Sequence, residues 1–344
     1  MLILSHNNPD PDAIASAWGL AKLIRSWSDA DVQLAYSGLL GRAENRELVR
    51  VLGEPFPRLE ELRGNFDGLI FVDSQPGGGN VTLPEGVEVV GILDHHPRGS
   101  LFKDIPFVDI RTHFGSCIAL LSVYWREAAV SFDTLSATVF YYAIKSETQE
   151  LGREASQQDR GLFRQLAQLV DWELLHRIVH APVPRNYYVT FKVALERARL
   201  YGDVLFADAG ELPIPDAAAE IAEWLLRLDE VKWALACGTY RGRLVFSLRT
   251  LTIGAHCGAL SQQIMAGWGS AGGHGMMAGG QTNLGMGSCY DRDAAILKLE
   301  QRYLTIMGKV DTAPTTDPFA VVTGELSRNA FPMNASSTRN LTNS

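Results

Sequence analysis

The sequence lacks the cysteine pairs and long apolar runs that mark several large classes of protein. Its 344 residues include only four cysteines, widely scattered, and no two of them form a CxxC pair. A thiolate zinc site and a disulfide framework are therefore not expected. There is no run of about 18 or more apolar residues, and the N-terminus lacks the basic and apolar segments of a secretion signal. We therefore expect a cytoplasmic protein without a membrane span.

Basic residues are also fewer than acidic ones. The chain has 31 Lys and Arg residues against 39 Asp and Glu residues, which gives a formal net charge of −8. Proteins that hold long duplex DNA through contacts with its phosphates are usually basic, so we expect no such partner. A small anionic substrate is still compatible with this charge, because bound metal ions or a local basic pocket can attract it.

Strands and helices alternate in the first third of the sequence. Apolar segments typical of buried parallel strands occur at 2–4, 31–38, 68–74, 87–96 and 105–110, and helix-like stretches separate the first of them. This alternation predicts an α/β domain with a parallel sheet flanked by helices. After residue 115, apolar residues recur at helical spacing, so we expect the remainder of this domain, to residue 182, to be helical.

The chain changes character at the prolines of HAPVPRNYY, and its length also suggests two domains. We expect a linker at 183–206 and a smaller α+β domain at 207–311, with a hairpin that turns at Arg241 and Gly242. The active-site cleft is expected between the two domains. Residues 312–344 are rich in Thr, Ser and Asn, which predicts a polar, partly disordered tail.

Acidic and histidine side chains gather where three of the predicted strands end. They are His6, Asp10, Asp12, Asp73, Asp94, His95 and His96. Because the carboxyl ends of parallel strands share one edge of a sheet, these side chains should lie close together. A bound cation would offset the repulsion and lost hydration of such a cluster. Oxygen and nitrogen ligands without sulfur suit Mn²⁺, Mg²⁺, Co²⁺, Fe²⁺ or catalytic Zn²⁺, and their number suits two ions bridged by a carboxylate.

Each of these residues also has a purely structural interpretation. Asp10 or Asp73 alone could cap the N-terminus of a helix, and a His-His pair after a strand is often only part of a polar loop. The metal interpretation depends on their occurrence together at one predicted edge.

The segments HNNPDPDA, VDS and LDHHP together resemble the motifs of the DHH phosphoesterase superfamily, named for the Asp-His-His triplet found here at 94–96. AENR at 43–46 and FVDIRTHFGS at 107–116 resemble further segments of these proteins. The resemblance extends over the N-terminal half in order and spacing, and it implies a parallel sheet flanked by helices. The two-domain layout is similar to that of the nanoRNase and pAp phosphatase subgroup.

This resemblance implies two divalent metal ions, with Mn²⁺ expected and Mg²⁺ or Co²⁺ as alternatives. His6 and Asp10 would bind one ion, Asp12 and His95 would bind the other, and Asp73 would bridge them. The nucleophile would be a water activated by the metals, so no Ser or Cys nucleophile is needed.

The other two residues of the triplet, one on each side of His95, would complete the site. Asp94 would orient a ligand imidazole, and His96 would face the substrate phosphate. One position departs from the family pattern, because AIKSETQELGR carries Glu147 where these proteins have aspartate. Glu147 either reaches the second ion through a backbone adjustment or is a helix residue without a ligand role.

The second half of the chain contains SAGGHGMMAGG, which resembles the Gly-Gly-Gly-His signature of the DHH-associated C-terminal domain. Gly272, Gly273 and His274 match it, and glycines let backbone N–H groups approach a phosphate. Arg249 stands where these domains carry a substrate-binding arginine. The resemblance therefore implies a phosphate clamp; a plain flexible loop and a solvated surface arginine are the alternatives.

The function implied is hydrolysis of phosphoester bonds in small nucleotides, by a metal-activated water. The substrates would be short oligonucleotides, linear dinucleotides or 3′,5′-bisphosphonucleotides such as pAp. An inorganic pyrophosphatase or exopolyphosphatase of the same superfamily is an alternative, although the chain lacks the basic Ser-Arg-Lys-Lys-type run of the pyrophosphatases. A non-catalytic nucleotide sensor is a third interpretation.

Overall fold

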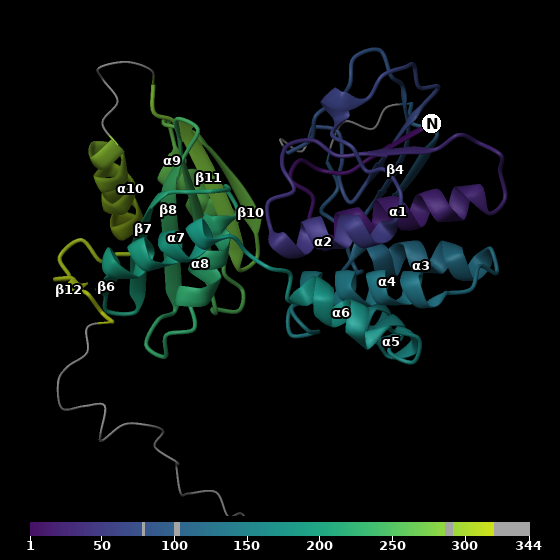
Figure 1. Ribbon diagram of the computed structural model, residues 1–344. Helices are drawn as coiled ribbons and strands as arrows, with labels where there is room; N and C mark the ends of the chain where they lie inside the picture. Colours follow the sequence, from purple (N-terminus) through teal and green to yellow (C-terminus); the bar gives the residue numbers. More distant parts are fainter. Residues whose placement is uncertain (78–79, 100–103, 286–291, 320–344) are drawn as a thin grey trace, which may run out of the picture. The chain divides into compact units, whose positions relative to one another are not determined.

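The computed structural model describes residues 1–77, 80–99, 104–285 and 292–319 (Figure 1). The chain divides into two compact units, Met1–Val183 and Pro184–Ser344, and each has its own sheet and its own core. Among the described residues, none of the helices combines the length and the hydropathy that a membrane span requires.

The first unit is built on a sheet of five parallel strands in the order β2-β1-β3-β4-β5. The strands are β1 (Leu2–Leu4), β2 (Gln33–Ala35), β3 (Leu69–Val72), β4 (Val89–Asp94) and β5 (Phe107–Ile110). This order places β1, β3 and β4 side by side, so the three strands that precede the predicted ligands end at one edge of the sheet.

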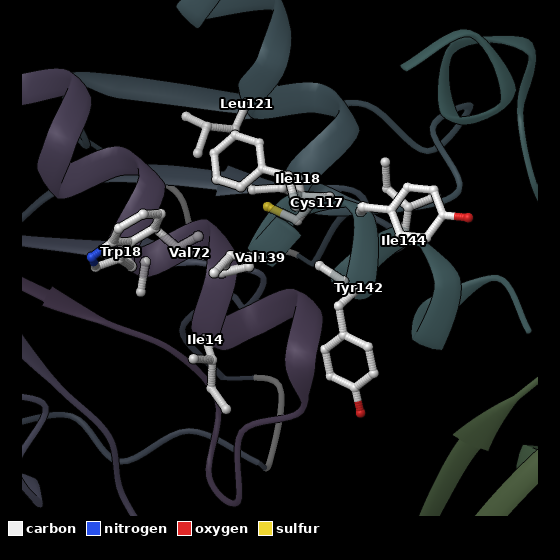
Figure 2. Close-up of a cluster of buried hydrophobic side chains, with 14 of the residues drawn as sticks. Ile14, Trp18, Val72, Cys117, Ile118, Leu121, Val139, Tyr142 and Ile144 are labelled. Atoms are coloured by element: carbon white, nitrogen blue, oxygen red, sulfur yellow. The ribbon is translucent and has the colours of Figure 1, made fainter. Parts of the chain in front are cut away.

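Helices cover one face of this sheet. They are α1 (Pro11–Arg25), α2 (Ala43–Leu52), α3 (Cys117–Glu127), α4 (Thr134–Glu147), α5 (Gln157–Leu166) and α6 (Trp172–Val179), with a short 3₁₀ helix, η1 (Leu59–Glu61), after α2. Figure 2 shows side chains of α1, α3 and α4 packed around Val72 of β3; among them are Ile14, Trp18, Ile118, Leu121 and Val139. The other face of the sheet buries Leu2, Leu4 and Phe71 against connecting segments such as Leu59–Glu61. Burial on both faces explains why these strands are continuous apolar runs.

The second unit contains a mixed sheet of seven strands in the order β10-β11-β9-β8-β7-β6-β12. The strands are β6 (Arg199–Tyr201), β7 (Val204–Glu211), β8 (Trp233–Tyr240), β9 (Arg243–Thr250), β10 (Ser270–His274), β11 (Met277–Asn283) and β12 (Thr315–Thr316). Its helices are α7 (Arg185–Glu196), α8 (Ala217–Leu225), α9 (Cys257–Met265) and α10 (Arg292–Ile306). The predicted α/β fold, with a second domain of mixed strands and helices, is confirmed, and so is the β8–β9 hairpin at Arg241 and Gly242.

The segment 183–206 is not a linker, in contrast to the expectation from its prolines. Pro184 directly precedes α7, and β6 pairs with β7, so both elements belong to the second unit. Proline is compatible with the start of a helix, because the first N–H groups of a helix have no intrahelical partner, and the two prolines mark that start. In the predicted polar tail, Thr315–Thr316 pairs with β6, while residues 320–344 lie outside the described part of the chain.

Candidate metal centre

The turns at the carboxyl ends of β1, β3 and β4 hold the predicted side chains close together. Asp73, the first residue after β3, has a φ of 54°, and Asn8 in the turn after β1 has a φ of 57°. Left-handed backbone is uncommon for residues other than glycine, and such conformations are frequent at functional sites. The backbone of Asp73 is still hydrogen-bonded to the adjacent strand β4, since its N–H donates to the carbonyl of Leu93.

The carboxylate of Asp73 has histidines on both sides. His6 lies near one of its oxygens, and His95 and His96 lie near the other. Its Oδ2 atom is 3.6 Å from Nε2 of His6, which is itself 3.7 Å from Oδ2 of Asp10. Its Oδ1 atom is 3.3 Å from Nε2 of His95 and 3.6 Å from Nδ1 of His96. The structure therefore brings together two three-residue groups that could each hold a cation, and Asp73 belongs to both.

The donor atoms in this cluster fit a divalent cation. Nδ1 of His6 is 3.0 Å from the carbonyl of Asn7, and Nδ1 of His95 is 3.2 Å from the carbonyl of Phe114. Because a carbonyl only accepts hydrogen bonds, Nδ1 carries the proton and Nε2 is left to face the carboxylates. Oδ1 of Asp73 and Nε2 of His95 are both buried, and neither has a hydrogen-bond partner among the described residues. Buried acceptors that face one another in this way are what a cation would satisfy.

Asp12 lies beside this cluster but is already engaged by α3. Its Oδ2 atom accepts from the N–H of Cys117 at 2.6 Å, and its Oδ1 atom accepts from the N–H of Ile118 at 2.9 Å. Its Oδ2 atom is also 3.8 Å from Nε2 of His95. Asp12 thus joins the first turn of α1 to the positive end of α3, and it presents one oxygen toward His95.

Asp94 fixes the triplet through hydrogen bonds. Its Oδ1 atom accepts from Nδ1 of His96 at 2.9 Å and from the N–H of His95 at 2.8 Å. Its Oδ2 atom accepts from Nε2 of Gln75 at 2.5 Å. Gln75 also accepts from the N–H of Gly99 at 2.8 Å, so it joins the end of β3 to the loop after β4. Sequence reasoning missed Gln75, although it stands two residues after Asp73.

A cavity of about 320 Å³ opens next to these residues. Its lining includes Asp73, Gln75, Asn80, Asp94 and His96. The side chain of His96 is 35% exposed, compared with 9% for His95, so His96 is the more accessible of the two histidines. A small anionic group in this cavity would lie next to His96.

Glu147, the last residue of α4, has a protein partner. Its Oε1 atom is 3.5 Å from Nη2 of Arg153, which also donates to the Glu147 carbonyl at 2.7 Å. Glu147 is in neither of the two three-residue groups, but its charge raises the pKa of both Asp12 and His95. The Glu147 carboxylate therefore lies near the cluster and also forms an ion pair with Arg153.

The charges of the cluster are unbalanced without a cation. Burial raises the pKa of Asp73 well above its usual value, and the nearby Asp12 adds to the effect. Burial also raises the pKa of Asp12, to about 7. Burial lowers the pKa of His6, but the hydrogen bond and charge of Asp10 outweigh it and raise the value to about 10. In the absence of metal, protons would take the place of the missing positive charge.

In the second unit, the predicted clamp residues lie on neighbouring strands. The strand register places Met277 of β11 opposite both Arg249 of β9 and His274 of β10. Gly273 has a φ of 150°, and a Cβ atom there would lie 2.4 Å from the carbonyl oxygen of Met277, so this glycine is required by the hairpin itself. A Cβ atom at Gly272 would meet nothing within 4 Å.

Arg249 is held by partners that the sequence did not reveal. Its Nε atom is 3.1 Å from Oε1 of Glu223 on α8, and its Nη1 atom donates to Oγ of Ser247 at 2.6 Å. The arginine side chain is only 11% exposed. It is therefore not a solvated surface residue, and an anion that binds it would meet Glu223.

Comparisons with known proteins place the fold. No protein-family model matches the chain. An uncharacterized protein from Methanocaldococcus jannaschii is 28% identical over 302 residues, which cover 87% of this chain and 61% of that protein. A probable manganese-dependent inorganic pyrophosphatase from Brevibacillus brevis is 27% identical over 170 residues, which cover 49% of this chain and 54% of that protein. The chain thus spans less than two thirds of the length of these curated relatives.

The fold of the chain also resembles that of a solved structure. An exopolyphosphatase-related protein from Bacteroides fragilis superposes with a TM-score of 0.68, covering 89% of this chain and 93% of that one at 15% identity. This likeness confirms the fold that the sequence motifs implied, whereas the identity is too low to transfer an activity.

Proposed function

We propose that the chain is a cytoplasmic, metal-dependent phosphoesterase that hydrolyses phosphoester bonds of small nucleotides. The observation that carries this proposal is a pair of buried atoms, Oδ1 of Asp73 and Nε2 of His95, which find no hydrogen-bond partner among the described residues and lie in a cluster of facing carboxylates and imidazoles. In a site with one shared carboxylate, two divalent ions would supply a water of lowered pKa and would neutralise phosphate oxygens. The manganese in the names of curated relatives supports Mn²⁺ as the ion.

Some residues of the first unit would bind the metal ions, and others would bind the substrate. His6 and Asp10 would hold one ion, His95 and an Asp12 oxygen would hold the other, and Asp73 would contact both. Asp94 keeps the His96 ring in place through its hydrogen bond. Burial lowers the pKa of His96, but the hydrogen bond to Asp94 outweighs it and raises the pKa to about 8. A protonated His96 could therefore donate to a phosphate oxygen in the adjoining cavity at neutral pH.

The second unit would hold the part of the nucleotide that is not cut. Arg249, Gly272, Gly273 and His274 would bind a phosphate or base. Because Glu223 already contacts Arg249, a bound phosphate must compete with a carboxylate. This competition would favour a doubly charged terminal phosphate over an internal phosphodiester with one charge.

An inorganic pyrophosphatase or exopolyphosphatase is a second candidate, favoured by the names of the curated relatives and of the structural neighbour. The missing basic Ser-Arg-Lys-Lys-type run counts against it. A nucleotide sensor would have the same fold but would bind substrate without turnover.

The test is a substrate panel on protein stripped with EDTA and reloaded with Mn²⁺, Mg²⁺ or Co²⁺. The panel contains pAp, pGpG, short RNAs, cyclic dinucleotides, pyrophosphate and polyphosphate. We expect metal-dependent hydrolysis of the linear nucleotides and little release of phosphate from pyrophosphate. Turnover of pyrophosphate or polyphosphate alone would favour the second candidate, and binding without turnover of any substrate would favour the sensor.

A further inference from the structure

The segment between β5 and α3, residues 114–118, contacts both side chains that we assign to the second ion. The carbonyl of Phe114 lies 3.2 Å from Nδ1 of His95 and accepts a hydrogen bond from the imidazole. The first two N–H groups of α3 donate to the two carboxylate oxygens of Asp12, at 2.6 Å and 2.9 Å. Because all these contacts come from one short segment, a shift of the segment would move Asp12 and His95 together.

Asp159, in the first turn of α5, holds this segment in place. The residue is fully buried. Its Oδ2 atom accepts from the N–H of Gly115 at 2.8 Å, and its Oδ1 atom accepts from Oγ of Ser116 at 2.5 Å. A Cβ atom at Gly115 would lie 2.5 Å from the carbonyl oxygen of Glu154 and 2.7 Å from Oδ2 of Asp159. The segment therefore approaches the start of α5 as closely as only a glycine allows.

The same carboxylate also caps its own helix. Its Oδ2 atom accepts from the N–H of Ser156, the N-cap of α5, at 2.8 Å, and Oγ of Ser156 accepts from the N–H of Asp159 at 3.1 Å. This reciprocal pair satisfies the helix end by itself. The bonds to Gly115 and Ser116 are therefore additional, and they join α5 to a segment that lies 44 and 43 residues away in the sequence.

The side chains assigned to the first ion have a different support. The carbonyl of the next residue lies 3.0 Å from Nδ1 of His6, and Oδ1 of Asp10 caps the N-terminus of α1. Nδ2 of Asn45, on α2, donates to the carbonyl of Pro9 at 3.0 Å and so fixes the turn after β1. These contacts come from α1, α2 and the turn itself, whereas those of the second ion's ligands lead to α3 and α5.

We propose that Asp159 is a positioning residue for the second metal ion. It would not contact the ion; it fixes segment 114–118, and that segment in turn orients Asp12 and His95. Hydrogen-bond partners of metal ligands set how tightly the metal is held, so loss of Asp159 should weaken the second ion and spare the first. This inference rests on the proposed metal-dependent activity, and it adds that separate parts of the fold support the two ions.

The experiment counts the Mn²⁺ ions bound by protein stripped with EDTA and measures the Kd of each, by calorimetric titration and by the EPR signal of free Mn²⁺. The test variants are Asp159→Asn, which keeps the shape of the side chain, and Ser116→Ala, which removes one bond between Asp159 and the segment. The matched control is Ser156→Ala. Both serines hydrogen-bond to Asp159 and cap a helix, but only Ser116 belongs to the segment. Thermal unfolding shows which variants are folded at the temperature of the titration.

We expect the wild type to bind two Mn²⁺ ions. Asp159→Asn should keep one Kd as in the wild type and raise the other at least about tenfold, the scale of a lost partner of a metal ligand. Ser116→Ala should raise the same Kd by a smaller factor, whereas Ser156→Ala should lower the midpoint of thermal unfolding and leave both Kd values unchanged. In a His95→Ala background, which retains the first ion, Asp159→Asn should change the remaining Kd no further.

Equal weakening of both ions, wild-type Kd values in Asp159→Asn, or the same loss in Ser156→Ala would overturn the inference while the metal-dependent activity stands. If Asp159→Asn does not fold, the comparison of Ser116→Ala with Ser156→Ala decides in the same way. A wild type that hydrolyses nucleotides with a single bound ion would also overturn the inference alone. Absence of Mn²⁺-dependent hydrolysis by the wild type would instead overturn the proposed function.

Discussion

Oδ1 of Asp73 lies 3.3 Å from Nε2 of His95, and neither buried atom has a hydrogen-bond partner in the described parts of the chain. An unsatisfied buried acceptor costs about 1–3 kcal/mol, and more when it is charged, so a chain that keeps two of them in contact gives up stability at this point. The same two atoms are well placed to share a cation. The pair therefore predicts that stability and activity respond in opposite directions to a single substitution.

Replacing Asp73 by Asn should abolish hydrolysis and should stabilise the metal-free protein. Asn has nearly the same shape and tolerates the left-handed backbone at this position, and it removes a buried charge that is close to Asp12. We expect a loss of at least about 1000-fold in kcat, which corresponds to roughly 4 kcal/mol. The midpoint of thermal unfolding in EDTA should rise. Near-normal turnover of any accepted substrate would rule out Asp73 as the shared ligand.

Protons and metal ions should compete for this site. The direction in which pH changes the stability of the metal-free protein follows from the pKa shifts. The pKa of His6 is raised from 6.5 to about 10, and that of Asp12 is raised from 3.8 to about 7. A raised pKa means that the folded state holds its proton more tightly than the unfolded state, so each group loses its stabilising contribution as pH rises through the folded value. The metal-free protein should therefore become less stable between pH 6 and pH 9.

Bound Mn²⁺ should weaken or reverse this trend, because the metal takes the place of the protons on His6 and Asp12. Thermal unfolding at several pH values, with EDTA or with saturating Mn²⁺, measures both curves. Calorimetric titration with Mn²⁺ in buffers of different ionisation enthalpy should show release of protons. Parallel stability curves with and without metal, together with no proton release, would contradict the assignment of these side chains as ligands.

The position of the site could be predicted from the sequence because strand ends are local features. The apolar runs before His6, Asp73 and Asp94 define three buried strands, and parallel pairing brings their ends to one edge. The order of the strands and the partners of Gln75 and Glu223 depend on contacts between distant segments, which one sequence does not show. The supposed linker was wrong for a related reason, since β6 is recognisable as a strand only through its pairing with β7.

Gln75 should be a positioning residue for His96. It holds Asp94 by a hydrogen bond of 2.5 Å and the following loop through Gly99. Gln75→Ala should lower kcat by about tenfold, the scale of one lost positioning hydrogen bond, with a smaller change in KM. The acidic variant Gln75→Glu should be worse, because it places a second carboxylate beside Asp94. The diagnostic readout is the pH profile of kcat, which should shift in Gln75→Ala if the orientation or pKa of His96 depends on this contact. An unchanged profile would leave Gln75 with a purely structural role.

Substitutions of Glu147 give the most direct test of which side chains coordinate the second ion. Its carboxylate is shared with Arg153, yet its charge acts on both Asp12 and His95. Glu147→Gln keeps the shape of the side chain and removes its charge, so we expect a higher Mn²⁺ concentration for half-maximal activity and recovery of activity at high Mn²⁺. Glu147→Asp restores the residue that the resemblance implies, and it should be tolerated.

The matched control is Arg153→Met, which removes the competing partner and leaves the carboxylate. If Glu147 ligates the second ion, this variant should bind Mn²⁺ at least as tightly as the wild type, since it removes a nearby positive charge. If Glu147 is only the partner of Arg153, both variants should lower the midpoint of thermal unfolding by similar amounts and neither should change the Mn²⁺ requirement. A metal-bound structure decides directly, because a ligating oxygen must lie about 2.0–2.4 Å from the ion.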